Sequence, residues 1–408
     1  RDRHYIMEEK LSMNSRQIFM QIIGYVSFSF IGYLLIGLPL AILPIFITKT
    51  LGFTELVAGI VISLQYVTTF ILRGYAGKIV DTKGPKPAVL LSMSLFILAG
   101  VLLYFCYFTR NNHFLSLAIL VLARLVTGAA EGMVGGSPIN WAILKIGQEH
   151  TAKAISYNGV ASYGALAIGA PLGVILNQYF GLGFIGLFSI VCAIIGYFLA
   201  RNKENILTAV SKVPQPFISV LKIVAPFGIC LALAGLGFGG ISNFITLYYD
   251  FYSWSNAALC LSVFSLLFIV GRLFFNSSIN TLGGLKVGII CMIVETIGLL
   301  ILFSAPNSFI ALIGAGITGI GFSLVFPAMG VEAVALVSDN SKGAALAAYG
   351  LFIDISLGIT GPLIGGVISL FGMSNLFGFC SLFVFIGLLY SYYLQTKKNR
   401  SEFNNSER

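Results

Sequence analysis

The residues with the clearest potential for chemistry are an arginine and a glutamate within one apolar run. Arg124 and Glu131 are seven residues apart in a segment rich in Leu, Val, Ala and Gly. On an α-helix this spacing places both side chains on one face, about 10 Å apart along the axis. Ionisable groups in such a segment are costly unless they are paired or face water. The pattern indicates either a structural ion pair or a glutamate that binds and releases protons.

The elements that must position these residues are membrane-spanning helices. The chain has 408 residues, of which 57% are hydrophobic and 10% charged, and its mean hydropathy is +0.94. A soluble domain has about 25% charged residues, so this chain cannot cover a water-exposed surface. Its apolar runs are continuous rather than alternating, which favours helices over a β-barrel. At roughly 20 to 25 residues per crossing, the length accommodates about twelve helices.

We therefore predict an all-α polytopic membrane protein, with twelve transmembrane helices in two pseudo-symmetric six-helix bundles. Residues 1–6 precede Met7, which has the look of a natural start, and they are left out of the fold prediction. The expected parts, in order, are a cytoplasmic segment at 1–16, the first bundle at 17–200, a cytoplasmic linker at 201–222, the second bundle at 223–394 and a cytoplasmic tail at 395–408.

The net charge of +9 indicates membrane orientation rather than nucleic-acid binding. The lysines and arginines lie in short connections and near the two ends, not on an amphipathic face. If the amino terminus is placed inside, only Lys49 and Arg110 of the 24 basic residues fall in outer turns. By the positive-inside rule, both termini are then cytoplasmic. We expect a bacterial cytoplasmic-membrane protein that does not bind nucleic acid.

Metal, disulfide and enzyme chemistry have no support in the sequence. The six cysteines are scattered singly through apolar runs without metal-ligand or disulfide spacing. The three histidines, His4, His113 and His150, lie outside the expected spans. We expect no enzyme activity, no metal and no cofactor, with a proton gradient as the energy source.

A basic, glycine-rich segment occurs between the second and third apolar runs. Residues 74–86 are expected to form a tight turn that contains the pattern Gly77-x-x-x-Asp81-x-x-Gly84-x-Lys86. A second copy, Thr281-Leu282-Gly283-Gly284-Leu285-Lys286, keeps the glycine and the lysine but replaces the acid with threonine. The first pattern resembles the loop between helices 2 and 3 of major facilitator superfamily transporters. Arg124-x-x-x-Gly128 likewise resembles that family's helix 4 signature, which is associated with proton coupling.

The resemblance covers the whole chain and extends to the bacterial arabinose-efflux-permease-like branch. The segments that suggest this branch are 73–77, 156–159 and 325–332. The fifth apolar run carries Gly159, Gly164, Gly169, Pro171 and Gly173, which resembles the helix 5 motif of the family's antiporters, although Ala170 separates the usual Gly-Pro pair. The resemblance implies the major facilitator fold and favours export over import.

The resemblance also implies conformational roles for some charged residues. In the family, the helix 2–3 loop braces the two halves, so a latch formed by Gly77, Asp81, Gly84 and Lys86 is expected, with a solvated turn as the alternative. In the family, the helices that carry Arg73 and Asp354 meet across the halves. Either these two residues form a contact that breaks on opening, with Arg73 part of the latch, or Asp354 is a second proton site. Glu295 lies on the ninth expected helix, which is peripheral in the family, so we expect it to form a structural ion pair with Arg272.

By the same resemblance, a substrate cavity would lie between the halves near mid-membrane. Its expected polar lining consists of Tyr33, Asn140, Asn158, Tyr163 and Asn243. We expect a monomeric secondary active transporter that carries out proton-coupled efflux of a small organic molecule by alternating access, with Glu131, Arg124 and Asp354 in proton coupling. The alternatives are a proton-coupled uptake symporter, a metallophore or siderophore exporter and a lipid flippase.

Overall fold

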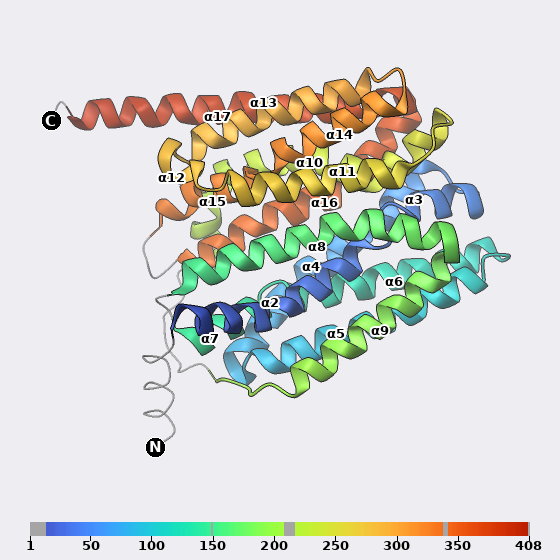
Figure 1. Ribbon diagram of the computed structural model, residues 1–408, viewed down its shortest axis with the longest axis horizontal. Helices are drawn as coiled ribbons and strands as arrows, with labels where there is room; N and C mark the ends of the chain where they lie inside the picture. Colours follow the sequence, from blue (N-terminus) through green and yellow to red (C-terminus); the bar gives the residue numbers. More distant parts are fainter. Residues whose placement is uncertain (1–13, 148–149, 208–216, 338–341, 407–408) are drawn as a thin grey trace. The chain divides into compact units, whose positions relative to one another are not determined.

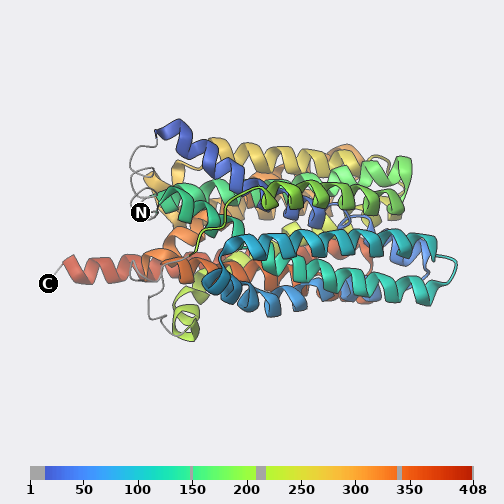
Figure 2. The same ribbon diagram turned by 90° about the horizontal axis from the view of Figure 1, so that it is seen from below.

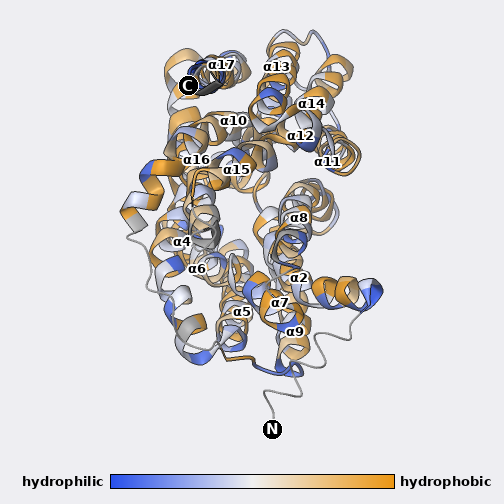
Figure 3. Ribbon diagram, turned by 90° about the vertical axis from the view of Figure 1, so that its left-hand side faces the viewer, coloured by the Kyte–Doolittle hydropathy of each residue, from blue (hydrophilic) through white to orange (hydrophobic). Residues whose placement is uncertain are grey.

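The computed structural model describes residues 14–147, 150–207, 217–337 and 342–406, and these residues form helices and turns without a strand. Twelve helical segments among them are long and apolar enough to cross a membrane, as the sequence predicts. Apolar residues predominate along most of these helices when they are seen end-on (Figure 3). The fold class is therefore confirmed as a helical, multi-pass membrane protein.

The chain divides into two compact units. The first unit consists of the described residues of Arg1–Pro39, Val67–Gly169 and Leu176–Ser211. Within it, α5 packs against α6 and α9, and α2 packs against α7. The helices that contribute to it are α2 (Ser15–Gly37), the second part of α4 (Glu55–Lys83), α5 (Pro85–Phe108), α6 (His113–Val134), α7 (Ser137–Ile146), most of α8 (Thr151–Phe180) and α9 (Leu182–Arg201). Figure 2 shows the chain from a second side, coloured along the sequence.

The second unit consists of Leu40–Tyr66, Ala170–Ile175 and the described residues of Lys212–Arg408. Within it, α10 packs against α16 and α17, and α13 packs against α14 and α17 (Figure 1). Its elements are α3 (Leu43–Ile45), the π-helical turn η1 (Phe46–Thr50), α10 (Phe217–Phe251), α11 (Ala257–Phe274), α12 (Ser278–Leu282), α13 (Gly284–Phe303), α14 (Ser308–Ser323), α15 (Val325–Ala335), α16 (Lys342–Phe371), η4 (Met373–Asn375) and α17 (Leu376–Ser406).

Two of the spanning segments are each divided into two helices. The fourth span is divided between α6 and α7 at Gly135 and Gly136, and Pro138 stands in the first turn of α7. The tenth span is divided between α14 and α15 at Leu324. Such interruptions are tolerated in lipid only where the freed backbone groups are buried in protein or line a cavity. The first interruption follows directly after the segment that carries Glu131.

The expectation of a turn over residues 74–86 is wrong for most of its length. α4 remains helical as far as Lys83, and the chain reverses at Gly84 alone, where φ is +84°. Gly74 and Gly77 lie within the continuous helix, and a Cβ added to either of them would meet open space. Side chains are strongly disfavoured at the dihedrals of Gly84, which explains why glycine stands there. Gly283, with φ +87°, makes the same reversal in the second copy.

The ends of two helices also differ from the sequence prediction. α17 continues as a helix to Ser406, whereas the sequence predicts that the last span ends near Leu394. α10 begins at Phe217, within the expected linker. Hydropathy marks only the apolar part of a helix, so a polar extension that remains helical is not detected by it. Part of the linker, residues 208–216, lies outside the described residues.

Within the second unit, the first part of α4 approaches α16 closely. A Cβ atom added to Gly59 or to Gly361 would overlap the backbone of the other residue, and one added to Gly365 would meet the carbonyl oxygen of Glu55. Within the first unit, Gly37 of α2 and Gly169 of α8 meet in the same manner. Small residues allow helix backbones to pack at such short range in membranes.

The reversal at Gly84 provides a test of this fold. We expect Gly84→Ala to destabilise the protein by roughly 1 to 3 kcal/mol, because alanine strains the backbone there and its Cβ would meet the Asn205 side chain. Gly77→Ala is the matched control, since it places a methyl group in open space on a continuous helix, where alanine is favoured over glycine. Thermal unfolding in detergent measures both; equal effects would contradict the assignment of the turn.

Candidate functional site

Glu131 on α6 lies against α4 in the interior of the first unit. Its side chain is 2% exposed, and Oε2 lies 3.0 Å from the hydroxyl oxygen of Thr69, which donates the hydrogen bond. The same hydroxyl lies 3.1 Å from the carbonyl oxygen of Gly128. A Cβ on Gly132 would stand 3.0 Å from the Thr69 carbonyl oxygen. Gly132 thus lets the two helices approach closely enough for Thr69 to reach the carboxylate.

Arg124 is buried on the same helix, as its spacing from Glu131 predicts. Its side chain is 1% exposed, and the neighbouring carbonyl oxygen of Leu125 accepts a hydrogen bond of 2.7 Å from Thr68 of α4. Two consecutive threonines of α4 therefore bind the helix that carries both ionisable residues. A charged group held this deep in a spanning helix is an indication of function in a membrane protein.

Two further polar side chains converge one turn beyond Glu131. The hydroxyl of Tyr33 and the guanidinium carbon of Arg73 lie 3.5 and 3.6 Å from the position that a Cβ on Gly135 would occupy. Tyr33 and Arg73, from two other helices, thus meet at Gly135, where the backbone carbonyl oxygen of Glu131 lies 3.2 Å from the same position. The sequence had assigned these residues to three different roles. Both Tyr33 and Arg73 are half-buried.

The other expected cavity residues are placed differently. In the first unit, the amide oxygen of Asn158 accepts a hydrogen bond of 2.7 Å from Ser29, Tyr163 is half-buried and Asn140 is exposed. In the second unit, Asn243 and Asp354 are buried, at 3% and 5% exposure. The Oδ1 atom of Asn243 has no hydrogen-bond partner among the described residues.

The lysine of the glycine-rich motif binds the end of α9. The Lys86 ammonium donates to the carbonyl oxygens of Arg201 and Lys203, at 2.7 and 2.6 Å. The Asn205 side chain donates to the Lys83 carbonyl oxygen and accepts from the Lys86 amide. A cation is favourable at a helix carboxyl terminus, so Lys86 fixes the start of the linker to the first unit. The side chain of Asp81, predicted as part of the latch, lies outside the described residues.

Trp141 strengthens this attachment, and the sequence did not indicate its role. Its indole N–H donates to the carbonyl oxygen of Glu204 at 3.0 Å, while its ring packs against Tyr25 and Phe28. The Lys203 ammonium lies 4.3 Å from the centroid of the Tyr25 ring. Burial, and then the nearby charge of Lys145, lowers the pKa of Lys203. The only sequence signal for this contact is a tryptophan within an apolar span, because the indole N–H usually finds a hydrogen-bond partner when the ring is buried.

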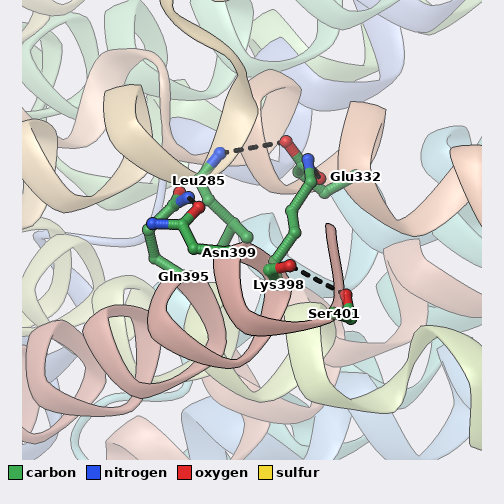
Figure 4. A network of polar contacts seen from close by, with 6 residues as sticks. All are labelled: Leu285, Glu332, Gln395, Lys398, Asn399 and Ser401. Carbon is green, nitrogen blue, oxygen red and sulfur yellow. Dashed lines mark hydrogen bonds and ion pairs between the residues drawn. The ribbon is translucent and has the colours of Figure 1, made fainter. Parts of the chain in front are cut away.

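In the second unit, the carboxylate of Glu332 joins three helices (Figure 4). Its Oε1 accepts a hydrogen bond of 3.2 Å from the amide of Leu285, in the first turn of α13. Its Oε2 lies 3.0 Å from the ammonium of Lys398 on α17. Glu332 itself belongs to α15 and is 9% exposed. An anion at a helix amino terminus that also pairs with a lysine is well satisfied in its charged form.

The predicted pair between Arg272 and Glu295 is not formed. Arg272 donates to the carbonyl oxygen of Ser323 at 3.0 Å. Glu295 is 0% exposed, and neither of its carboxylate oxygens has a hydrogen-bond partner among the described residues. Similar depth in consecutive helices does not fix which way the side chains point, and Glu295 points instead toward α10, where Oε1 lies 2.5 Å from the Cβ position of Gly237.

Comparison with known proteins is consistent across sequence and structure. A family model described as Major Facilitator Superfamily matches residues 25–285 and 228–408. An uncharacterized MFS-type transporter of Pseudomonas aeruginosa is 50% identical over 385 residues, covering 94% of this chain and 96% of its own. A similarly named protein of Burkholderia mallei is 46% identical over 384 residues, covering 93% of each.

Two solved structures share the arrangement of helices at low sequence identity. The nucleoside transporter NupG matches with a TM-score of 0.74 and 13% identity, over 91% of this chain and 99% of its own. The human organic anion transporter MFSD10 (TETRAN) matches with a TM-score of 0.68 and 14% identity, again over 91% and 99%. At these identities the likeness shows the fold alone.

The attachment of the linker can be tested at Lys86. We expect Lys86→Ala to lower the stability of the protein by about 1 kcal/mol, because it removes a charged donor from two carbonyl oxygens at the end of α9. Lys83→Ala is the control, since that side chain is exposed and its bonded carbonyl belongs to the backbone. Denaturation in detergent compares the two variants. If Lys83→Ala lowers the stability as much as Lys86→Ala, the effect comes from the change in net charge and not from the contact of Lys86 with the end of α9.

The Glu332 network gives a second test. Lys398→Ala should cost roughly 1 kcal/mol, discounted because the lysine side chain is 43% exposed while that of Glu332 is 11% exposed. Lys397→Ala, which removes an exposed neighbour of the same charge, should have almost no effect. A double-mutant cycle with Glu332→Gln isolates the pair, and a coupling energy of zero would contradict the contact.

Proposed function

The chain belongs to the Major Facilitator Superfamily and is therefore a secondary transporter, and we propose that it exports a small organic molecule in exchange for protons by alternating access. The observation that carries this proposal is the environment of Glu131. A carboxyl group that is 2% exposed and bonded to a neutral hydroxyl loses much of its solvation in the charged form. In the proposed cycle, Glu131 would take up a proton in one conformation and release it in the other as its access to water changes.

The neighbours of Glu131 support this role. Arg73 and Tyr33 approach the chain one turn beyond the glutamate, at Gly135. A guanidinium group and a phenol supply a fixed positive charge and a hydrogen-bond donor next to the proton site. A substrate that binds beside them would alter the local field, and this would couple substrate occupancy to the protonation of Glu131. The position of these residues at an interrupted helix fits a binding role.

The helix packing supports two conformations. The first part of α4 packs on α16 within the second unit, through Gly59 and Gly361, while the second part of α4 belongs to the first unit. α4 therefore contributes to both units, and alternating access would require a change in or beside this helix. Export is favoured over uptake by the antiporter-like glycine and proline pattern of α8, which includes Gly164 and Pro171.

The proposed orientation places both termini in the cytoplasm and the protein in a bacterial cytoplasmic membrane. Lys49 then lies on the outer side, where its ammonium pairs with Asp250 at 3.0 Å and both side chains are largely exposed. The abundant basic residues at the opposite ends of the helices support this orientation. The proton gradient would supply the energy, and the transporter would act as a monomer.

A thermal-shift screen of the purified protein against amphipathic drugs, sugars and metallophores identifies a ligand for transport assays. In proteoliposomes with a pH gradient, wild-type protein should move this compound against its gradient, in the direction opposite to the protons. Movement in the same direction as the protons would instead identify an uptake symporter and would overturn the proposal of export.

Glu131→Gln tests the assigned proton site. We expect gradient-driven transport to fall by at least an order of magnitude, because the amide cannot exchange a proton, while exchange of labelled for unlabelled substrate persists. Glu402→Gln, which alters an exposed acid near the end of α17, is the control and should transport normally. Wild-type rates for Glu131→Gln under a pH gradient would contradict the role of Glu131.

A further inference from the structure

Among the described residues of the second unit, the carboxyl group with the least exposure to solvent is that of Glu295. Glu295 of α13 is 0% exposed. Its Oε1 lies 2.5 Å from the Cβ position of Gly237 on α10, and its backbone is in contact with Gly321 of α14. An added Cβ at Gly237 would also meet Leu299 and Val384, which line the same interior space from α13 and α17. The carboxyl group is thus enclosed by four helices.

No basic group reaches this carboxyl among the described residues, since neither oxygen has a hydrogen-bond partner there. The titratable groups around it are thiols: Cys291 of α13 and Cys380 of α17 both interact with it electrostatically. Arg272 of α11, the residue that the sequence pairs with Glu295, donates to the Ser323 carbonyl oxygen instead. α10 contributes the backbone at Gly237, and α14 contributes Gly321.

Glu332 in the same unit shows how a buried glutamate is normally satisfied. Its two oxygens bind an amide at a helix amino terminus and a lysine ammonium. Glu295 has neither type of partner in the described structure. An uncompensated carboxylate in an apolar interior is far more costly than a neutral carboxylic acid, which loses only the hydrogen bonds of its polar atoms. The environment of Glu295 therefore favours the neutral carboxylic acid.

We propose that Glu295 is a proton-binding site of the second unit, which holds a proton while α10, α13, α14 and α17 are packed as in this structure. The ligand is a proton, because the oxygens are enclosed by aliphatic groups, glycine backbone and thiols rather than by further oxygen ligands for a metal ion. The site is separate from Glu131, which belongs to the first unit.

The contact with Gly237 gives the proton site a structural consequence. α10 also packs on α16 through Gly235 and Gly239, whose added Cβ atoms would meet Ser356 and Thr360. The carboxyl group is directly apposed to α10, with no room for water between Oε1 and the helix backbone. Loss of the proton would require water or a cation to enter, and α10 would have to move away from α13. Protonation of Glu295 therefore stabilises the packed position of α10.

Infrared spectroscopy of the wild-type protein, Glu295→Gln and Glu332→Gln tests this proposal directly. The carbonyl stretch of a protonated carboxylic acid should be present in the wild type at neutral pH, should weaken in Glu295→Gln and should be unchanged in Glu332→Gln. An unchanged band in Glu295→Gln would show that Glu295 is ionised in the wild type and would overturn the proposal.

Stability as a function of pH gives an independent measurement. At neutral pH, Glu295→Gln or Glu295→Met should fold with a melting temperature within about 2 °C of the wild type, because each is neutral and similar in size. The melting temperature of the wild type should fall more steeply at alkaline pH than that of either variant, since only Glu295 has a proton to lose. Failure of both variants to fold, or parallel pH profiles, would contradict the proposal.

Exchange of sodium for choline in the same assay distinguishes the ligand. The melting temperature should be the same in both salts for the wild type and for Glu295→Gln. A stabilisation by sodium that Glu295→Gln abolishes would identify a cation as the ligand and would overturn the assignment of a proton site.

Discussion

The free-energy cost of removing a carboxyl group from water is the constraint on which this structure depends. Three glutamates are buried in the spanning helices, and each meets this cost differently. Glu332 is fully compensated by a helix amino terminus and a lysine. Glu131 is bonded to the hydroxyl of Thr69, and Glu295 has no hydrogen-bond partner in the described structure. Glu332 thereby joins three helices, whereas Glu131 and Glu295 are the two glutamates for which we propose proton binding.

Glycine makes these environments possible, because it lets helices approach more closely than other residues allow. Gly132 lets α4 come within hydrogen-bonding distance of the helix that carries Glu131. Gly237 makes room for the carboxyl group of Glu295 against α10. Where a span is interrupted, as after Gly135, side chains from neighbouring helices occupy the gap. The close helix contacts at glycines therefore also enclose the buried carboxyl groups.

Much of this could be predicted from the sequence, since hydropathy reports directly on membrane burial. The twelve spans and the placement of Arg124 and Glu131 within one of them follow from local pattern. The prediction of a turn was wrong for residues 74–83. The glycines of this segment, Gly74 and Gly77, are part of α4 and do not break it. The composition indicated a turn of several residues, but the chain reverses at Gly84 alone, where φ is positive.

Partners distant in sequence could not be predicted, because nothing local specifies them. Lys86 binds carbonyl oxygens at the end of α9, and Trp141 binds the chain just beyond them. Carbonyl oxygens carry no signature in the sequence. Arg272 and Glu295 lie at similar depth, yet their side chains point to different neighbours. The rotation of each helix about its axis decides such pairs, and only the packed structure supplies it.

The central claim is that a buried glutamate exchanges its proton as the protein binds and releases its cargo. The most direct measurement is the proton release or uptake that follows addition of a ligand to purified protein in weakly buffered solution, followed with a pH indicator. The account predicts a pH-dependent proton exchange for the wild type that is absent in Glu131→Gln, although the variant still binds the ligand. Equal proton exchange by both proteins, or none by the wild type at any pH, would contradict it.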